Sequence, residues 1–356
     1  MKYLLFIPFF LLLLSCISSK NASKEVGESE IVSDQELNSQ QEGWLKLGII
    51  SHDEGDYDKA KEYYQRILKQ KPNSSQALYE ISYSTVEQNN LKEALSYIRR
   101  GEKIESETRF LFYHMEGISL DKMGKPEEAI EAFKKGIEVN PSFHLLHYSL
   151  AITSINLGDN EQGIESLKNA INSNFEHSSS HLLLGNTYRN LGNNIPSVLA
   201  YTYFLFYESN TTRSEEAFIS IYEIFDSAKK DSTSNDINIS LSSLMGGSNE
   251  QIEGIETILA LSNATRFLED AETSKIQFIV SSYEKLVDLL AQSQDKYANK
   301  GFIRANYVPY LIQVHEAGYL ETLVYLLFES SGFEGVESWI INDCIKCEDF
   351  YEWTPE

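Results

Sequence analysis

Small side chains recur along this chain with a period of about 34 residues, and no other feature of the sequence constrains the fold as strongly. One series is Gly48, Ser82, Gly117, Ala151 and Gly185. A second series, spaced by 34, 35, 34 and 34 residues, is Ala60, Ala94, Ala129, Gly163 and Ser197. Two helices approach each other closely only where the side chains at the contact are small. Each unit is therefore predicted to be a pair of antiparallel helices.

Two further series keep the same period. Large apolar residues lie one turn beyond the second small residue of each unit, where we expect them to fill the space between neighbouring pairs. They are Tyr64, Ile98, Phe133, Leu167 and Tyr201. Residues that tolerate a positive φ stand at the turn inside each pair, at Gly55, Asn89, Gly124, Gly158 and Gly192. The agreement predicts five units, at 41–74, 75–108, 110–143, 144–177 and 178–211.

The first unit resembles the tetratricopeptide repeat (TPR), because it carries Trp44, Leu47-Gly48, Ala60, Tyr64 and Pro72 in the order of that family's signature. The resemblance implies an all-α, right-handed superhelical solenoid whose first helices line a concave groove for a protein or peptide partner. By the same resemblance, the groove residues include Leu45, Ile49, Tyr79, Tyr83, His114, Ile118, Tyr148, Ile152, Asn186 and Arg189.

Three aromatic groove residues, Tyr79, Tyr83 and Tyr148, are the expected binding anchors, because a few aromatic side chains commonly supply most of the energy of an interface. The alternative is that single groove residues only pack and stiffen the superhelix. Chaperone-binding members of the family grip a peptide's terminal carboxylate with Lys, Asn and Arg. Only Asn186 and Arg189 match that set here, so recognition of this type is not expected.

Residues 1–16 read MKYLLFIPFFLLLLSC, with Lys2 before an apolar run that is too short for a comfortable transmembrane helix. The end of this stretch resembles a bacterial lipobox. That resemblance implies a signal peptide at 1–15, acylation of Cys16, and a lipid-anchored protein of the cell envelope, on the periplasmic face of the outer membrane. The alternative is ordinary cleavage with Cys16 lost or idle. Residues 16–40 are predicted to be the lipidated cysteine and a flexible tether, with Ser33 or Asp34 capping the first helix.

After residue 211 the period fails, and residues 212–356 are predicted to form a C-terminal helical domain that caps the solenoid. The apolar spacing predicts a helix over 214–230, with Ser214 as its N-cap, packed on the fifth repeat like a sixth first helix. Further helices are predicted at 251–261, 274–296, 301–316, 319–329 and 334–347. Pro309 predicts a kink or a late start in the third of these.

No chemistry of catalysis is evident. The formal net charge of −23 disfavours nucleic acid as a partner. Cys344 and Cys347 form a CxxC, but the thioredoxin-like context is missing and no further ligands complete a zinc site. We interpret them as semi-buried cysteines on one helix face. The sequence carries no phosphate-binding loop, GxSxG or HExxH motif. No enzyme, cofactor or metal is therefore predicted.

The expected function is that of a membrane-anchored scaffold that binds a protein or peptide in the cell envelope. An alternative is a glycan-binding or nutrient-binding outer-membrane lipoprotein of the starch-utilisation type. Such lipoproteins also carry TPR helices behind a lipid anchor, and aromatic side chains stack on their sugars. A third class is an enzyme in the C-terminal domain, which would require a surface pocket with perturbed carboxylates.

Overall fold

The structure of the chain is a computed structural model that describes residues 31–226, 228–230, 237–239, 254–265, 274–293 and 301–353. The predicted signal peptide and Cys16 lie outside these residues. So does the side chain of Cys344, whereas Cys347 of the same CxxC is buried. None of the helices in the described ranges is long and apolar enough to span a membrane.

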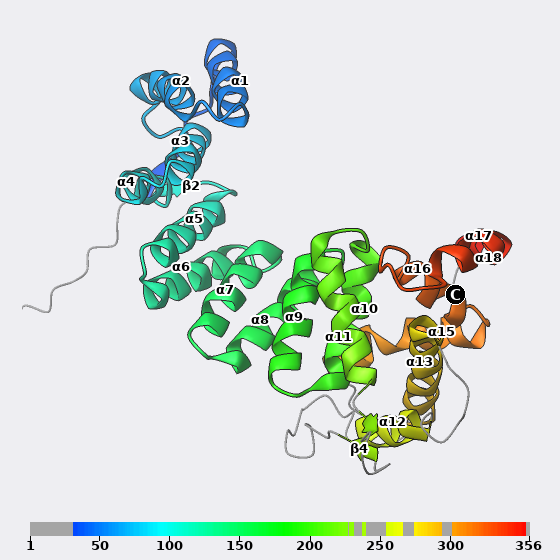
Figure 1. Cartoon of the computed structure of the whole chain (residues 1–356). Helices are drawn as coiled ribbons and strands as arrows, with labels where there is room; N and C mark the ends of the chain where they lie inside the picture. Colours follow the sequence, from blue (N-terminus) through cyan, green and yellow to red (C-terminus); the bar gives the residue numbers. More distant parts are fainter. Residues whose placement is uncertain are drawn as a thin grey trace, which may run out of the picture.

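Five pairs of antiparallel helices stack in chain order into a solenoid (Figure 1). They are α1 (Ser39–Asp53) with α2 (Tyr57–Gln70), α3 (Ser75–Glu87) with α4 (Leu91–Gly101), α5 (Arg109–Lys122) with α6 (Pro126–Val139), α7 (His144–Asn156) with α8 (Asn160–Ser173), and α9 (Ser178–Asn190) with α10 (Asn194–Tyr207). The first helices α1, α3, α5 and α7 lie side by side along one face of the array. The all-α solenoid predicted from the sequence is confirmed.

Within three of the pairs, an aromatic ring fills the space above a first-helix glycine. A Cβ added at Gly48 would lie 2.4 Å from Cε1 of Tyr64, and one at Gly117 would lie 2.3 Å from Cε1 of Phe133. At Gly185 the nearest atom would be Cδ1 of Tyr201, at 2.7 Å. These rings therefore pack against the first helix of their own pair, and Tyr64 and Tyr201 also lie near Ser84 and Ser220 of the element that follows.

The turns inside the pairs have the predicted conformation. Asn89 adopts a φ of 58°, and the glycines at the equivalent turns of the other four pairs adopt φ values between 73° and 85°. Asn is among the few residues other than glycine that enter this left-handed region at modest cost. The second pair thus reverses direction without a glycine.

The segment before α1 is packed against the array. β1 (Val32–Ser33) pairs in parallel with β2 (Ile104–Glu105), and an Oδ atom of Asp34 accepts a 2.9 Å hydrogen bond from the backbone N–H of Ser75 at the start of α3. Asn38 is the N-cap of α1 and forms a capping box with Gln41. Residues 32–38 are therefore not a flexible tether, and neither Ser33 nor Asp34 caps the first helix. Asp34 instead accepts from the free N–H group and from the hydroxyl of Ser75 in the first turn of α3.

The sixth first helix is present as α11 (Thr212–Phe225), and its apolar face of Ala217, Phe218, Ile221 and Phe225 is buried. Its N-cap is Thr211, and Ser214 is the reciprocal partner in the capping box, so the predicted cap is wrong by three residues. The helix also ends earlier than predicted. Residues Ala228–Lys230 form β3, which pairs antiparallel with β4 (Ile237–Ile239).

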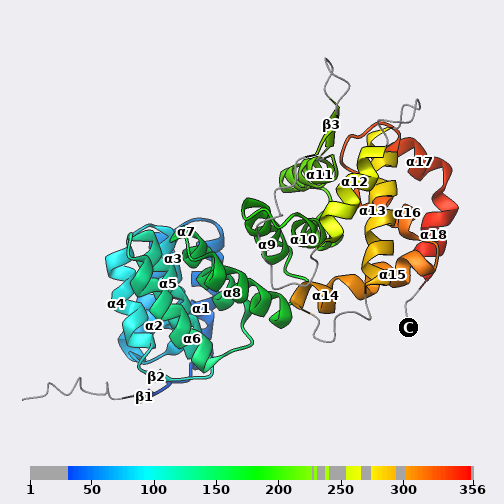
Figure 2. The ribbon, with the colours of Figure 1, turned by 90° about the horizontal axis from the view of Figure 1, so that it is seen from below.

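The remaining described elements are helices, of which α13 (Lys275–Gln292) packs against several others (Figures 1 and 2). They are α12 (Ile255–Ala264), α14 (Phe302–Asn306), α15 (Val308–Glu316), α16 (Leu320–Leu327), α17 (Val336–Asn342) and α18 (Cys344–Glu352). Pro309 stands in the first turn of α15, which agrees with the predicted late start. The single helix predicted at 334–347 is wrong, because Asp343 separates α17 from α18.

The C-terminal helices share one hydrophobic core with the fourth and fifth repeats, whereas the first four repeats contribute to a separate core. The connection is made largely by α10, in which every residue from Ile195 to Leu205 is buried. Polar groups reinforce it. The Tyr203 hydroxyl donates to the backbone oxygen of Tyr307 at 3.0 Å, and the hydroxyls of Thr202 and Tyr283 lie 2.7 Å apart.

His181 joins the same contact. Its Nε2 lies 2.7 Å from the backbone oxygen of Phe175, and its Nδ1 lies 2.7 Å from the hydroxyl of Tyr307. Burial lowers the pKa of His181 to about 4, so the ring is neutral near pH 7. Because a carbonyl can only accept, Nε2 carries the proton, and Nδ1 accepts from Tyr307. One neutral imidazole thus ties the fifth repeat to the C-terminal domain.

We expect Gly117→Ala to destabilise the array, because the new Cβ would overlap the buried Phe133 ring. Overpacking of this kind costs about 1–3 kcal/mol, more than alanine's higher helix propensity returns. Gly43→Ala in α1 is the matched control, because a Cβ there meets nothing within 4 Å. Urea denaturation measures both. Equal stability of the two variants would contradict the glycine–ring packing.

Candidate functional site

The predicted groove residues lie on the first helices, and most of them are half-buried. Nine of the ten are partly covered by neighbouring side chains, whereas Tyr83 is 42% exposed. Leu45, Tyr79 and Ile118 pack against the N-terminal core. Tyr148 packs against the C-terminal core. Of the predicted anchors, Tyr83 therefore offers the most surface to a partner.

Polar side chains connect successive first helices along the predicted groove. His52 Nδ1 of α1 lies 2.8 Å from Ser84 Oγ of α3, and Thr153 of α7 donates to Asp121 of α5 at 3.4 Å. His114 Nε2 of α5 lies 2.9 Å from Ser149 Oγ of α7. These contacts keep neighbouring repeats at a set spacing. They also occupy polar groups that a partner would otherwise meet.

Asn186 and Arg189, the two residues that resemble a carboxylate clamp, are engaged within the chain. The Tyr201 hydroxyl donates to Asn186 Oδ1 at 2.6 Å. Arg189 forms an ion pair with Glu223 and donates to Ser220, both on α11. The guanidinium group therefore links the fifth repeat to the sixth first helix. Both residues of the partial match are thus held by partners within the chain.

His114 has the environment of a packing residue. Burial, together with His144, lowers the pKa of its imidazole to about 4. Its ring centroid lies 5.7 Å from that of Phe143 in an edge-on arrangement. His144 and His177 lie nearby, with centroids 4.8 Å apart, but the described residues contain no group of three or more His, Cys, Asp or Glu side chains placed to hold a metal ion.

The three predicted aromatic anchors do not form one surface. Tyr79 and Tyr83 are neighbours, with ring centroids 6.5 Å apart, and Tyr83 also stacks on His52 at 4.6 Å. Tyr148 instead contacts His177 edge-on at 4.9 Å. The predicted groove thus carries an aromatic cluster on the first two repeats and a separate one on the fourth.

An aromatic pocket that the sequence pattern did not reveal lies where the fifth repeat meets the C-terminal helices. It has a volume of about 390 Å³ and is lined by Phe175, Tyr203, Phe206, Tyr207, Asn306 and Tyr310. The one sequence signal was α10 itself, NIPSVLAYTYFLFY, which carries no charged residue. A helix without a charged face must be covered on all sides. That requirement places its aromatic residues between two domains.

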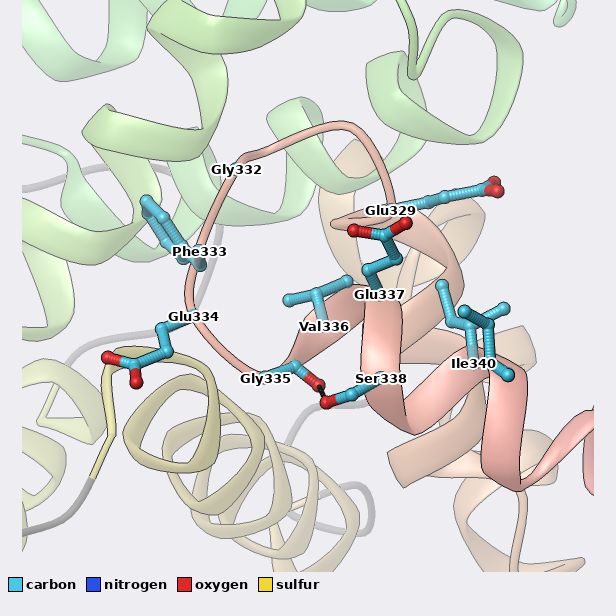
Figure 3. A pocket seen from close by; sticks show the side chains of 10 residues that line it. Glu329, Gly332, Phe333, Glu334, Gly335, Val336, Glu337, Ser338 and Ile340 are labelled. Atoms are coloured by element: carbon cyan, nitrogen blue, oxygen red, sulfur yellow. Dashed lines mark hydrogen bonds between the residues drawn. The ribbon is translucent and has the colours of Figure 1, made fainter.

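A larger hollow of about 690 Å³ lies at the loop between α16 and α17 (Figure 3). Glu329 and Glu337 stand on one side of this loop, and Glu334 points away from them. Val336 lies at its base, and Ser338 donates to the backbone oxygen of Gly335 at 3.1 Å. This hollow holds carboxylates but no histidine, cysteine or serine–base pair that would indicate catalysis.

Perturbed carboxylates do occur, but in the repeat array. Glu102 follows α4 and Glu116 lies in α5, and both are largely removed from water. Burial, and then the charge of Glu116 and a hydrogen bond to it, raise the pKa of Glu102 to about 8. Arg99 approaches Glu116 at 3.5 Å and offsets part of this effect. The pair lies between two repeats and away from both pockets, so it does not indicate an enzyme in the C-terminal domain.

The family model of the tetratricopeptide repeat matches residues 41–74 and 112–143. These two segments are the first and third helix pairs, and the repeats predicted there are confirmed. A comparison with curated proteins found no match.

Similar solved structures are distant. Pseudomonas aeruginosa pilF aligns with a TM-score of 0.46 and 11% identity over 78% of this chain and 97% of its own. PilW, described as a type IV pilus biogenesis factor, aligns with the same TM-score and identity over 76% and 99%. A thermophilic TPR protein of Thermus thermophilus reaches 0.43 and 21% over 50% and 99%. Likenesses of this size do not say what the chain binds.

We expect Glu102→Gln to stabilise the protein at alkaline pH. The unfolded chain ionises Glu102 above its ordinary pKa of 4.5, whereas the folded chain resists ionisation until about pH 8, so this group makes the fold less stable as pH rises between those values. The substitution should raise the free energy of unfolding by on the order of 1–3 kcal/mol at about pH 9 and by little near pH 5.

Urea denaturation across this pH range measures the effect of Glu102→Gln. The control is Glu107→Gln, which removes the same charge from an exposed residue of the same connection. If wild type and Glu102→Gln lost stability equally between these pH values, the assignment of a protonated Glu102 would be wrong.

Proposed function

We propose that this protein is a scaffold whose TPR groove binds a protein or peptide partner through its first two repeats. The observation that carries the proposal is that Tyr83, on the first helix α3, stays 42% exposed although its ring stacks on those of His52 and Tyr79. Aromatic side chains that are fixed by packing and still exposed lose little conformational freedom on binding, which favours them as anchors.

The surrounding geometry supports this assignment. Tyr79 lies beside Tyr83 and edge-on to the buried Phe112 at 6.1 Å, so the pair rests on the core of the second and third repeats. The hydrogen bond between His52 and Ser84 sets the spacing of α1 and α3 beneath the two rings. A partner segment lying across these helices would thus meet a surface that is already ordered. Tyr148 then serves as a secondary contact two repeats away.

We further propose that the scaffold is held at a bacterial membrane of the cell envelope by acyl chains on Cys16. Two or more chains, each contributing about 0.8 kcal/mol per buried methylene, make such attachment stable. Residue 32 is already fixed to the array by its pairing with Ile104. The 15 residues from 17 to 31 span at most about 50 Å even when fully extended. The array would therefore remain close to the membrane surface.

Glycan binding is the second candidate, and the aromatic pocket of about 390 Å³ beside Tyr203 and Tyr310 favours it. Its rings offer the flat apolar faces on which sugars stack. The pocket lies at the C-terminal end of the array, far along the chain from Tyr83. The two candidates therefore respond to different substitutions.

We expect Tyr83→Ala to weaken peptide binding about tenfold, because the loss of one anchor commonly costs more than 1 kcal/mol. Tyr63→Ala is the control, since Tyr63 lies on the second helix α2 under Arg66. Binding of the full chain to an array of 15-residue peptides, followed by titration of the strongest peptides, provides the measurement. A panel of oligosaccharides run in parallel tests the second candidate. Peptide affinities unchanged in Tyr83→Ala would remove the proposed groove site.

We expect Cys16→Ala to abolish incorporation of labelled palmitate and to move the protein from the membrane to the soluble fraction. The thiol of Cys16 is the proposed attachment point, and no other group would take its place. Cys344→Ala is the control and should be labelled like wild type. Palmitate labelling that persisted in Cys16→Ala would disprove the anchor.

A further inference from the structure

The aromatic surface on the first two repeats consists of four rings in contact, which we call the aromatic platform: His52, Tyr57, Tyr79 and Tyr83. The centroid of His52 lies 5.1 Å from that of Tyr57 and 4.6 Å from that of Tyr83, and Tyr83 lies 6.5 Å from Tyr79. Two of these contacts are stacked and one is edge-on. Helices α1, α2 and α3 each contribute to the platform.

Three carboxylates surround the platform. Glu80 and Glu87 stand on α3 one residue after Tyr79 and four residues after Tyr83, and Asp53 ends α1. Burial is the main reason that the pKa values of Tyr79 and Tyr83 are raised, and nearby carboxylates add to the effect. Asp53 likewise adds to the effect of burial on Glu80, whose pKa is raised. The carboxylates therefore lie close enough to act on the rings and on one another.

These carboxylates have no internal cation. Within the described part of the chain, Asp53, Glu80 and Glu87 form no ion pair and no side-chain hydrogen bond. A nearby cation instead pairs with a carboxylate elsewhere. Lys61 of α2 pairs with Glu93 of α4 at 3.1 Å.

The cation–π contacts of the first two repeats also lie away from the platform. Arg66 lies over the ring of Tyr63 at 5.3 Å on α2, and Arg100 lies over that of Tyr97 at 6.0 Å on α4. In the described ranges, no cation of the chain lies over a ring of the platform. Among the described residues, cations of the chain thus cover Tyr63 and Tyr97 but none covers the four rings of the platform.

We propose that the aromatic platform and its three carboxylates form a site for a lysine or arginine side chain of an extended basic segment in the protein partner. A cation over a tyrosine face is attracted by the ring's negative quadrupole, and arginine also stacks on such rings. Carboxylates beside the rings add Coulomb attraction and accept the cation's hydrogen bonds. This preference is opposite to that of a carboxylate clamp, which selects acidic chain ends.

This proposal rests on the groove function proposed above and adds a chemical class of partner to it. A neutral apolar segment would gain contact with Tyr79 and Tyr83 but would leave three carboxylates desolvated without compensation. An acidic segment would be repelled. A basic segment alone uses both the rings and the charges of the site. Its binding should weaken with added salt, because the charges stay near the protein surface.

The test uses the full chain, purified in detergent, on an array of 15-residue peptides of varied composition. We expect the bound peptides to be enriched in lysine and arginine. Each bound peptide is then reprinted with its basic residues replaced by glutamine, which should weaken binding about tenfold. The double variant Glu80→Gln/Glu87→Gln should lose the enrichment while it remains at least as stable to heat as the wild type.

The matched control is Glu127→Gln/Glu138→Gln, which removes two charges from exposed residues of the second helix α6. If this variant lost the enrichment equally, the overall acidity of the chain and not the site would be the cause. Bound peptides without basic enrichment, or enrichment unchanged by Glu80→Gln/Glu87→Gln, would overturn this inference and leave the peptide-binding groove in place. An array without any bound peptide would reject the groove itself.

Discussion

The burial of α10 on every side is the constraint on which the arrangement of the molecule depends. In the other four pairs the second helix has a polar outer face that is exposed to solvent. Each of those pairs therefore buries its apolar surface only against the neighbouring pairs. α10 has no such face, since its residues from Ile195 to Leu205 are all buried. The fifth pair therefore cannot end the array with its second helix exposed to solvent. The C-terminal helices cover α10 and complete one hydrophobic core with it.

Contacts within the chain also limit which surfaces of the first helices are open to a partner. Much of the inner face is occupied by contacts between its own helices, as with Arg189 and Glu223, or Asn186 and Tyr201. These contacts stiffen the superhelix and satisfy polar groups at once. The first two repeats differ because Tyr83 remains exposed there. Tyr83 is thus a groove residue that contacts within the chain leave partly uncovered.

Most of the helices in the structure could be predicted from local periodicity in the sequence. The repeat helices follow from small and large residues at a constant period, and the helix predicted at 274–296 is present as α13, which buries Ile279, Leu286 and Leu290. Apart from local errors at helix ends, the features that the sequence did not predict depend on residue pairs distant in sequence. The pairing of Val32 with Ile104 joins two strands of two residues each, and strands this short have no recognisable alternation of apolar and polar residues. The aromatic pocket joins segments about a hundred residues apart, and no spacing within either segment indicates the other.

The short pairing of β1 with β2 has a mechanical consequence. A pull on the chain ahead of residue 32 reaches the body of the protein through the hydrogen bond from the N–H of Val32 to the backbone oxygen of Lys103, and through the contact of Asp34 with Ser75. Both receiving residues lie in or beyond the second repeat. Tension therefore bypasses α1 and α2 and enters the solenoid from its flank. The first helix pair, although nearest to the N-terminus, lies outside the path of such a load while these contacts hold.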